Sequence, residues 1–308
     1  MSRIICLIIS FALVVGAISA CQPESTPTVI SPTISATRSA TATPSPPTRT
    51  ATQATPCPTE ATTANTPVAS ATESGCQEET GEIASGSFES TILGKEFHYR
   101  IYFPPCYSAQ PDQPYPVLYL LHGLGSDETQ WESLGVADEM DRLVSSGAAQ
   151  PMLIVMPRDP ENKSYPLSDY PEIFITELIP YIDSHYPTQT ERTGRMIGGI
   201  SRGASWALRL GVSQAGMFSK IGLHSLPLEP SESDDWAEEL AAMAPSERPA
   251  LFMDSGHRDR DIDSTRSFEW ALTIAGVPHT WYLFNGYHNE AYWQEHLPIY
   301  LEWYTQGK

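Results

Sequence analysis

The stretch RMIGGISRGASWAL, residues 195–208, places a serine between glycines at a point where the chain changes its hydrophobic period. Residues 195–200 form a short apolar run, typical of a strand that is buried on both faces. The small and apolar side chains after Ser201 are typical of the start of a helix. Because Gly199–Gly203 also matches the pattern G-x-S-x-G, we predict a tight strand-to-helix turn that presents the Ser201 hydroxyl as a nucleophile.

Short apolar runs recur on both sides of this turn and alternate with helical patterns. We expect eight strands, near residues 82–90, 97–103, 116–121, 152–157, 195–200, 219–224, 249–254 and 280–284. We expect helices over residues 136–146, 172–185, 202–214, 234–243, 262–275 and 290–305, the second of them kinked at Pro180. This alternation predicts an α/β fold with a mostly parallel sheet of about eight strands and helices on both faces. The first two strands follow one another without a helix, so we expect them to form an antiparallel hairpin at the edge of the sheet.

The chain contains eight histidines that could serve as the base for Ser201. In enzymes with this serine turn the order along the chain is serine, acid, histidine, and the histidine comes just after the last strand. His288 follows the predicted strand 280–284 and fits that order. We therefore expect His288 to take the Ser201 proton and to return it to the leaving alcohol.

The acid that orients the histidine should lie in residues 251–263, LFMDSGHRDRDID. Four carboxylates are candidates there: Asp254, Asp259, Asp261 and Asp263. Asp254 ends an apolar strand, whereas Asp259 lies in the loop after it, where this fold places its acid. We predict Asp259, and the other three remain alternatives.

The spacing D-x-D-x-D from Asp259 to Asp263 also suggests a calcium loop. However, Ser264 stands at the position of the turn glycine and Trp270 at the position of the bidentate glutamate. We therefore expect neither a metal nor another cofactor.

An oxyanion hole would need two backbone N–H groups. Arg202, directly after the nucleophile, should supply one. Leu124 should supply the other, because Gly123 lets the backbone turn inward after the predicted strand 116–121. Near this loop, His122 and Trp131 are candidate substrate contacts. Alternatively, His122 braces the loop and Trp131 packs in the core instead of stacking on a sugar or an aromatic acyl group.

The N-terminal residues predict export. Arg3 precedes a nearly all-apolar stretch, 4–18, and Ile18–Cys21 resembles the lipobox of bacterial lipoproteins, whose cysteine carries lipid. We predict a lipoprotein signal peptide at residues 1–20, with lipidation of Cys21. The alternative is an uncleaved anchor helix. Either way, we expect an exported protein at the cell surface or anchored to the membrane.

Residues 21–75 are rich in Thr, Ser and Pro and predict a disordered tether ahead of a catalytic domain at residues 76–308. The net charge of −19 over 308 residues argues against nucleic acid, and against a membrane except through the N-terminal anchor. Cys76 and Cys106 bracket the first two strands, and an exported domain could link them in a disulfide. Cys57 has no obvious partner.

Together these segments resemble the putative-esterase family of α/β-hydrolases. That family includes bacterial feruloyl and acetyl-xylan esterases, enterochelin esterases, S-formylglutathione hydrolase and mycolyltransferases. The segments that carry the resemblance are 99–107, 116–131, 177–183, 198–208, 256–259 and 286–293. The resemblance implies a Ser201–Asp259–His288 triad with Leu124 and Arg202 at the oxyanion hole. One departure is Leu223–Leu226, LHSL, where relatives more often show a small Ser-Gly turn.

We expect a serine esterase that acts on a small-molecule or polysaccharide ester, in particular on acyl esters of carbohydrates. Acyl transfer to a sugar hydroxyl and a non-catalytic surface binding module are the alternatives. We expect short or aromatic acyl groups to be preferred, because residues 226–249 are rich in Glu, Asp and Ser and would make a poor lid at an oil interface.

Overall fold

The computed structural model describes residues 76–306 except 111–112, 162, 164 and 230. These residues belong to one of the two units into which the chain divides, 70–308. The predicted signal peptide, 1–20, and tether, 21–75, lie outside the described residues, and so do Cys21 and Cys57. In the part that is described, no helix is both long enough and apolar enough to cross a bilayer.

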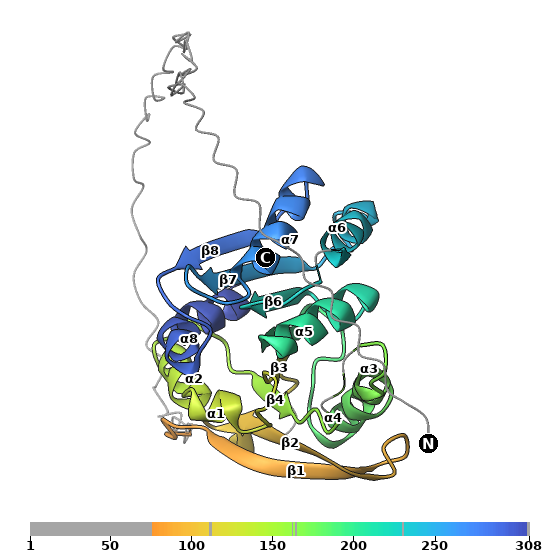
Figure 1. The fold of residues 1–308 in the computed structure, drawn as a ribbon. Coiled ribbons are helices and arrows are strands. Elements are labelled where there is room, and N and C mark those ends of the chain that lie inside the picture. The colour runs from red at the N-terminus through yellow and green to blue at the C-terminus, as the bar shows by residue number, and fades with distance from the viewer. Residues whose placement is uncertain (1–75, 111–112, 162, 164, 230, 307–308) are drawn as a thin grey trace, which may run out of the picture. The chain divides into compact units, whose positions relative to one another are not determined.

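Eight strands form one sheet in the order β1-β2-β4-β3-β5-β6-β7-β8 (Figure 1). They are β1 (Glu82–Ser90), β2 (Lys95–Phe103), β3 (Val117–Leu121), β4 (Leu153–Pro157), β5 (Arg195–Ile200), β6 (Lys220–His224), β7 (Ala250–Gly256) and β8 (Thr280–Phe284). β1 and β2 pair antiparallel as a hairpin, and β2 is antiparallel to β4. The remaining neighbours are parallel. The predicted mostly parallel sheet with an antiparallel edge hairpin is confirmed.

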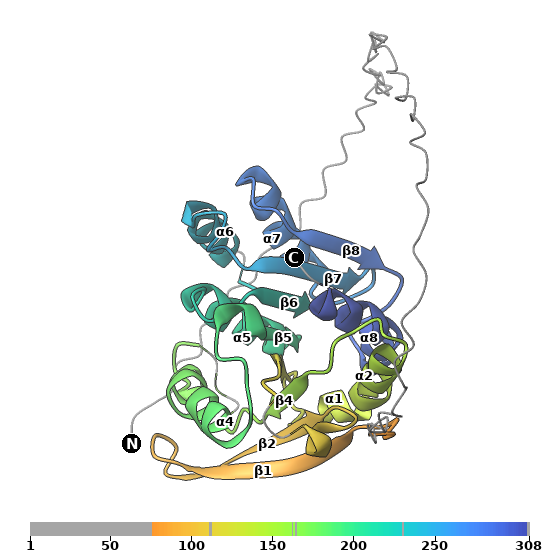
Figure 2. The ribbon, with the colours of Figure 1, turned by 180° about the vertical axis from the view of Figure 1, so that it is seen from behind.

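The helices cover both faces of this sheet (Figures 1 and 2). They are α1 (Gln130–Ser133), α2 (Val136–Ser145), α3 (Tyr170–Ile173), α4 (Ile179–His185), α5 (Arg202–Ser213), α6 (Glu232–Ala242), α7 (Ile262–Ile274) and α8 (Glu290–Thr305). One core cluster joins α1, α2 and α8 to one face, and another joins α3–α7 to the opposite face. The central strands β3–β6 are buried throughout because both of their faces are covered.

The helix predicted over 172–185 differs in detail from the structure. It begins at Tyr170, and a π-helical segment, Phe174–Leu178, separates α3 from α4. Pro180 lies in the first turn of α4 and has no N–H to continue an α-helical ladder, so a wider turn ahead of it is tolerated.

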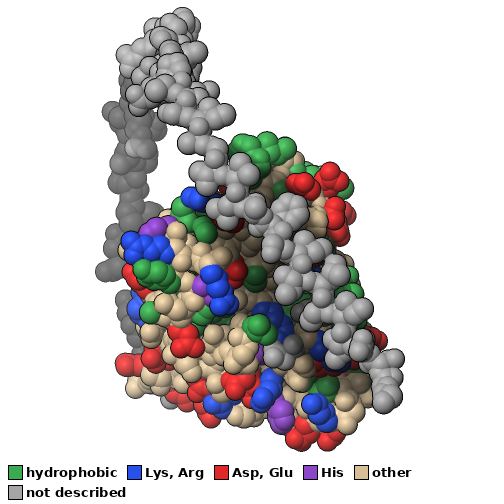
Figure 3. All heavy atoms as spheres, in the orientation of Figure 1, with side chains coloured by type: hydrophobic (Ala, Val, Ile, Leu, Met, Phe, Trp, Pro, Cys, Tyr) green, Lys and Arg blue, Asp and Glu red, His purple; other side chains and the backbone are tan. Residues whose placement is uncertain are grey.

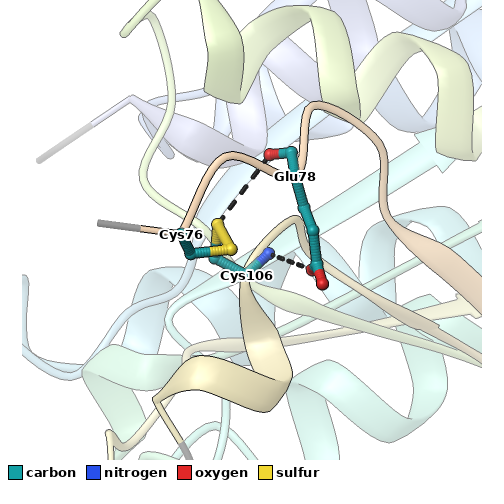
Figure 4. The surroundings of a disulfide bond; sticks show 3 residues. All are labelled: Cys76, Glu78 and Cys106. Carbon is teal, nitrogen blue, oxygen red and sulfur yellow. Dashed lines mark hydrogen bonds between the residues drawn. A yellow bond between two sulfur atoms is a disulfide. The ribbon is translucent and has the colours of Figure 1, made fainter. Parts of the chain in front are cut away.

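A disulfide joins Cys76 to Cys106 (Figure 4). The two Cα atoms are 5.7 Å apart, and 30 residues separate the cysteines along the chain. The backbone N–H of Cys106 donates to Glu78 Oε2 at 3.0 Å, so the segment before β1 is also held by a polar contact. The bridge therefore encloses the β1–β2 hairpin.

Candidate active site

Ser201 lies at the tight turn between β5 and α5. Its φ of 54° and ψ of −124° place a non-glycine residue at positive φ, which is uncommon. The turn is possible because Gly199 and Gly203, two residues before and after the serine, lack side chains: a Cβ on Gly203 would lie 2.2 Å from the Leu121 carbonyl oxygen. The Ser201 N–H donates to the His224 carbonyl at 2.8 Å, which ties the turn to the end of β6.

The structure brings together the three residues that were predicted as a triad. His288 Nε2 lies 2.8 Å from Ser201 Oγ, and His288 Nδ1 lies 2.8 Å from Asp259 Oδ1. His288 comes from the loop between β8 and α8, and Asp259 from the loop between β7 and α7. Because a carboxylate can only accept, Nδ1 carries the proton and Nε2 is left to accept the proton of Ser201.

The surroundings of Asp259 keep its carboxyl ionised. Asp259 Oδ1 also accepts the backbone N–H of Asp261 at 2.8 Å. Burial alone would raise the pKa of Asp259. Donation from His288, from the Asp261 N–H and from the nearby Ser225 hydroxyl outweighs burial and holds that pKa below its usual value. A charged Asp259 at neutral pH fixes the orientation of the imidazole.

The other three carboxylates of the acid segment have different places. Asp261 Oδ2 is 3.4 Å from His288 Nδ1, and its side chain is partly exposed. Asp254 is fully buried, and its carboxylate binds His224 at 2.8 Å. Asp263 is exposed in the first turn of α7. Only Asp259 therefore combines burial with a short contact to His288.

The loop after β3 passes beside the nucleophile. A Cβ on Gly123 would lie 3.6 Å from Ser201 Cβ, so the backbone that leads into Leu124 is next to the serine. The Gly123 N–H donates to the side-chain oxygen of Gln130 at 2.8 Å. Arg202 is the first residue of α5. Both residues predicted as oxyanion donors therefore flank Ser201.

Trp131 and His122 do not serve as substrate contacts, and this part of the prediction was wrong. Trp131 is 1 % exposed, and its Nε1 donates to the Leu121 carbonyl at 3.1 Å, so the ring belongs to the core. His122 is also buried, and both of its ring nitrogens are engaged within the protein. As in the alternatives given above, His122 braces the loop after β3 and Trp131 packs in the core.

Two further residues support the site and were missed in the sequence. Trp293 packs edge-on against the His288 ring, with centroids 5.1 Å apart, and its Nε1 donates to Ser225 Oγ at 3.0 Å. Ser225 is buried, with a φ of 56°, and its hydroxyl is one of the groups that lower the pKa of Asp259. The departure at LHSL thus lies behind the acid and not on the substrate side. The only signal in the sequence was that Trp293 follows His288 by five residues.

One pocket opens at the serine, and a second pocket adjoins it at Leu124. The first, of about 580 Å³, is lined by Leu124, Ser201, His288, Asn289, Glu290 and Trp293 among others. The second, of about 400 Å³, shares Leu124 with the first and includes Arg202, Trp206 and Asp261. Its lining also includes Arg209, whose guanidinium binds Glu232 and lies 5.3 Å from the centroid of the Tyr165 ring. An ester placed at Ser201 could direct its acyl and alcohol parts into these two spaces.

Potential metal ligands gather at two places in the described part of the chain. One group is Asp259, Asp261 and His288, and the other is Cys76, Glu78 and Cys106. Hydrogen bonding to His288 and to the Asp261 N–H already engages Asp259 Oδ1. The two sulfur atoms are bonded to each other and so are not thiolate ligands.

The amino-acid sequence is similar to a known protein family and to known proteins. Residues 90–304 match the protein family described as "Putative esterase". The chain is 31% identical over 156 residues to an endo-1,4-beta-xylanase/feruloyl esterase of Xylanibacter ruminicola, which covers 47% of this chain and 22% of that protein. The matched region is thus only about a fifth of that relative's length.

Solved structures show the same arrangement of strands and helices. A ferulic acid esterase superposes with a TM-score of 0.67 and 28% identity, over 73% of this chain and 98% of that chain. S-formylglutathione hydrolase from Staphylococcus aureus superposes with a TM-score of 0.62 at 20% identity, over 74% and 98% of the two chains. The second likeness is one of fold, and that fold is the α/β-hydrolase fold.

Proposed function

Because this chain belongs to the "Putative esterase" family, we propose that it is a serine esterase that hydrolyses carboxylic esters, in particular acyl esters of carbohydrates. The observation that carries the proposal is the continuous line of contacts from Asp259 through His288 to Ser201 Oγ. Both steps of that line measure 2.8 Å. This geometry allows proton transfer without movement of the chain.

The reaction would proceed in two halves. As Ser201 Oγ attacks the ester carbonyl, His288 Nε2 takes its proton, and the backbone N–H groups of Leu124 and Arg202 bind the oxyanion. His288 then gives the proton to the leaving alcohol, and the acyl group stays on Ser201. Water next attacks this acyl-enzyme while His288 takes its proton, and the proton returns to Ser201 as the acid leaves.

Three features support a sugar ester with a short or aromatic acyl group. The pocket at Ser201 and the pocket that adjoins it at Leu124 are each in the size range of small-molecule sites. Residues 226–249 include α6, whose first turn carries Glu232, Asp234 and Asp235. These acidic side chains make the segment unsuited to contact with an oil surface. On the face drawn in Figure 3, acidic and basic side chains are interspersed, which suits a neutral ester better than a polyanion.

A substrate panel tests this proposal. Methyl ferulate, acetylated xylan and tributyrin or longer glycerides are assayed with wild type and Ser201→Ala, with and without free sugar. We expect kcat/KM to be highest for the first two and to vanish in Ser201→Ala. Higher kcat/KM for long-chain glycerides would refute the substrate class, and product only with added sugar would replace hydrolysis by acyl transfer. Absence of both turnover and fluorophosphonate labelling of Ser201 would leave a binding module.

The proposed enzyme is exported and anchored by lipid on Cys21. In this organisation residues 1–20 are the lipoprotein signal peptide, residues 21–75 the tether and residues 76–308 the catalytic domain. Sequence alone supports this arrangement. We expect Cys21→Ala to move the protein from the membrane fraction to the soluble exported fraction. Unchanged membrane association would favour an uncleaved anchor helix.

A further inference from the structure

We propose that Asp159 is a positioning residue that links the two sides of the oxyanion hole. Its backbone holds the loop that carries Leu124, and its side chain holds the first turn of α5, which carries Arg202. This inference rests on the proposed function, since it concerns the alignment of the two N–H groups that would bind the oxyanion. It assigns to Asp159 a role that is separate from the triad.

The first half of the link runs through His122. The Asp159 N–H donates to His122 Nε2 at 2.9 Å, and His122 Nδ1 lies 2.8 Å from the Gly123 carbonyl oxygen. A backbone N–H can only donate and a carbonyl oxygen can only accept, so the proton must be on Nδ1. Burial, the largest influence, lowers the pKa of His122, which agrees with a neutral ring.

This contact fixes the direction of the Leu124 N–H. In a planar trans peptide, the carbonyl of one residue and the N–H of the next point in opposite directions. The Gly123 oxygen is held by His122 Nδ1 and, at 3.2 Å, by the Ser126 N–H. The Leu124 N–H therefore cannot rotate unless Gly123 gives up these contacts.

The second half of the link runs through the Asp159 carboxylate. Its Oδ2 binds Arg202 Nη2 and accepts from Trp206 Nε1 at 3.1 Å. Arg202 and Trp206 are four residues apart on α5, and the guanidinium lies 5.9 Å from the centroid of the Trp206 ring. Asp159 therefore holds the N-terminal part of α5 through two side chains, Arg202 and Trp206, immediately after Ser201.

Burial makes the link stiff. The Asp159 and Arg202 side chains are 5% and 15% exposed, so water competes little for their ion pair. One residue supplies both the N–H for His122 and the carboxylate for Arg202. The separation of the two oxyanion donors is thus set across a single residue, which is the second residue after β4. Removal of either half would leave the Leu124 N–H fixed only by its loop and the Arg202 N–H fixed only by α5.

The test compares Asp159→Asn with Asp169→Asn, which removes a carboxylate from an exposed position of the same segment. We measure kcat and KM on p-nitrophenyl acetate, the rate of Ser201 labelling by a fluorophosphonate, and the affinity for a trifluoromethyl ketone. Loss of one oxyanion donor costs about 10²–10³ in kcat, so misalignment should cost about 10–100-fold. We expect that loss in Asp159→Asn, with KM within about twofold, and parallel losses in labelling and ketone affinity. Asp169→Asn should match wild type.

A double-mutant cycle tests the link itself. If His122 and Asp159 act as one unit, His122→Phe with Asp159→Asn should cost no more than the worse single variant. Arg202→Lys keeps the charge and the backbone donor. It should lower kcat several-fold. If Asp159→Asn fails to fold, Arg202→Lys replaces it as the test of the link. Folding is checked from unfolding midpoints.

The outcomes separate the two proposals. A wild type that neither cleaves esters nor takes the label would overturn the proposed function and this inference with it. If the wild type is active, any one of three results would overturn this inference and leave the proposed function standing. These are wild-type kcat in folded Asp159→Asn and Arg202→Lys, a change confined to KM, or fully additive losses in the cycle.

Discussion

The His224 imidazole and the Asp254 carboxylate, both fully buried, are joined by a 2.8 Å contact beneath the serine turn. Asp254 Oδ2 also accepts the hydroxyls of Tyr292 at 2.6 Å and Tyr300 at 2.7 Å. The His224 carbonyl accepts the Ser201 N–H. A second His–Asp pair therefore lies under the first and has no route to the substrate.

This buried pair should matter for stability. Asp254 accepts from three buried donors, and a buried donor left without its acceptor costs about 1–3 kcal/mol. We therefore expect Asp254→Asn to lower the free energy of unfolding by about 3 kcal/mol or more, as measured in urea. Asp263→Asn, at an exposed position of α7, is the control and should change it by only a few tenths of a kcal/mol. An equal effect of both substitutions would contradict the prediction.

Asp259→Asn and Asp261→Asn should differ in their effect on turnover. Asp259 is the buried partner of His288 Nδ1 at 2.8 Å, whereas Asp261 is partly exposed at 3.4 Å. Without Asp259 the imidazole loses its correct tautomer, a loss of about 10⁴ in the serine-protease template. We expect a loss approaching that size for Asp259→Asn and less than about tenfold for Asp261→Asn, with kcat as the readout. The opposite ranking would make Asp261 the acid.

The disulfide should stabilise the domain without affecting catalysis. Closing a loop of 30 residues contributes about 3.5 kcal/mol in the chain-entropy model. We expect the double variant Cys76→Ser, Cys106→Ser to lose about this much stability and to keep its kcat. A reducing agent should have the same effect on the wild type and none on the variant. Peptide mass spectrometry that finds both thiols free in the untreated protein would remove the basis of the prediction.

The buried His122 should make stability depend on pH. Its pKa is lowered in the folded state, while the unfolded chain protonates it near pH 6.5. Below about pH 6.5 the unfolded state therefore binds more protons, and stability falls as the pH falls. The stability advantage of wild type over His122→Phe should be smaller at about pH 5 than at about pH 7.5, in urea titrations. A constant difference would show that His122 keeps its ordinary pKa.

The strands could be predicted because their apolar runs have the lengths and spacing that a sheet covered on both faces requires. The residues at Ser201 could be chosen because chain order in this fold limits the choice to one histidine and one acid loop. Asp254 shows where such reasoning ends. As a carboxylate at the end of an apolar strand, Asp254 looks like a candidate acid. Only the structure shows that it binds His224 instead of His288.

Contacts between distant elements could not be predicted. Tyr304 of α8 places its hydroxyl against the sheet, where a Cβ on Gly198 or Gly222 would lie 1.7 or 1.8 Å from it. These glycines of β5 and β6 leave room for a side chain that comes 106 and 82 residues later in the sequence, and nothing in the sequence near them indicates it. Trp131 is similar, because its burial depends on its contacts with Leu121 and His224.

The disulfide also determines how a mechanical load would enter the domain. Cys76 is the first of the described residues, and it is covalently bonded to Cys106. A pull on that end passes through the sulfur atoms to Cys106, and residues 77–105 form a closed loop beside the path of the force. The hairpin of β1 and β2 cannot be peeled off the sheet from its N-terminal end. Tension is carried first by the segment between Cys106 and β3, so the outermost strands stay paired under load.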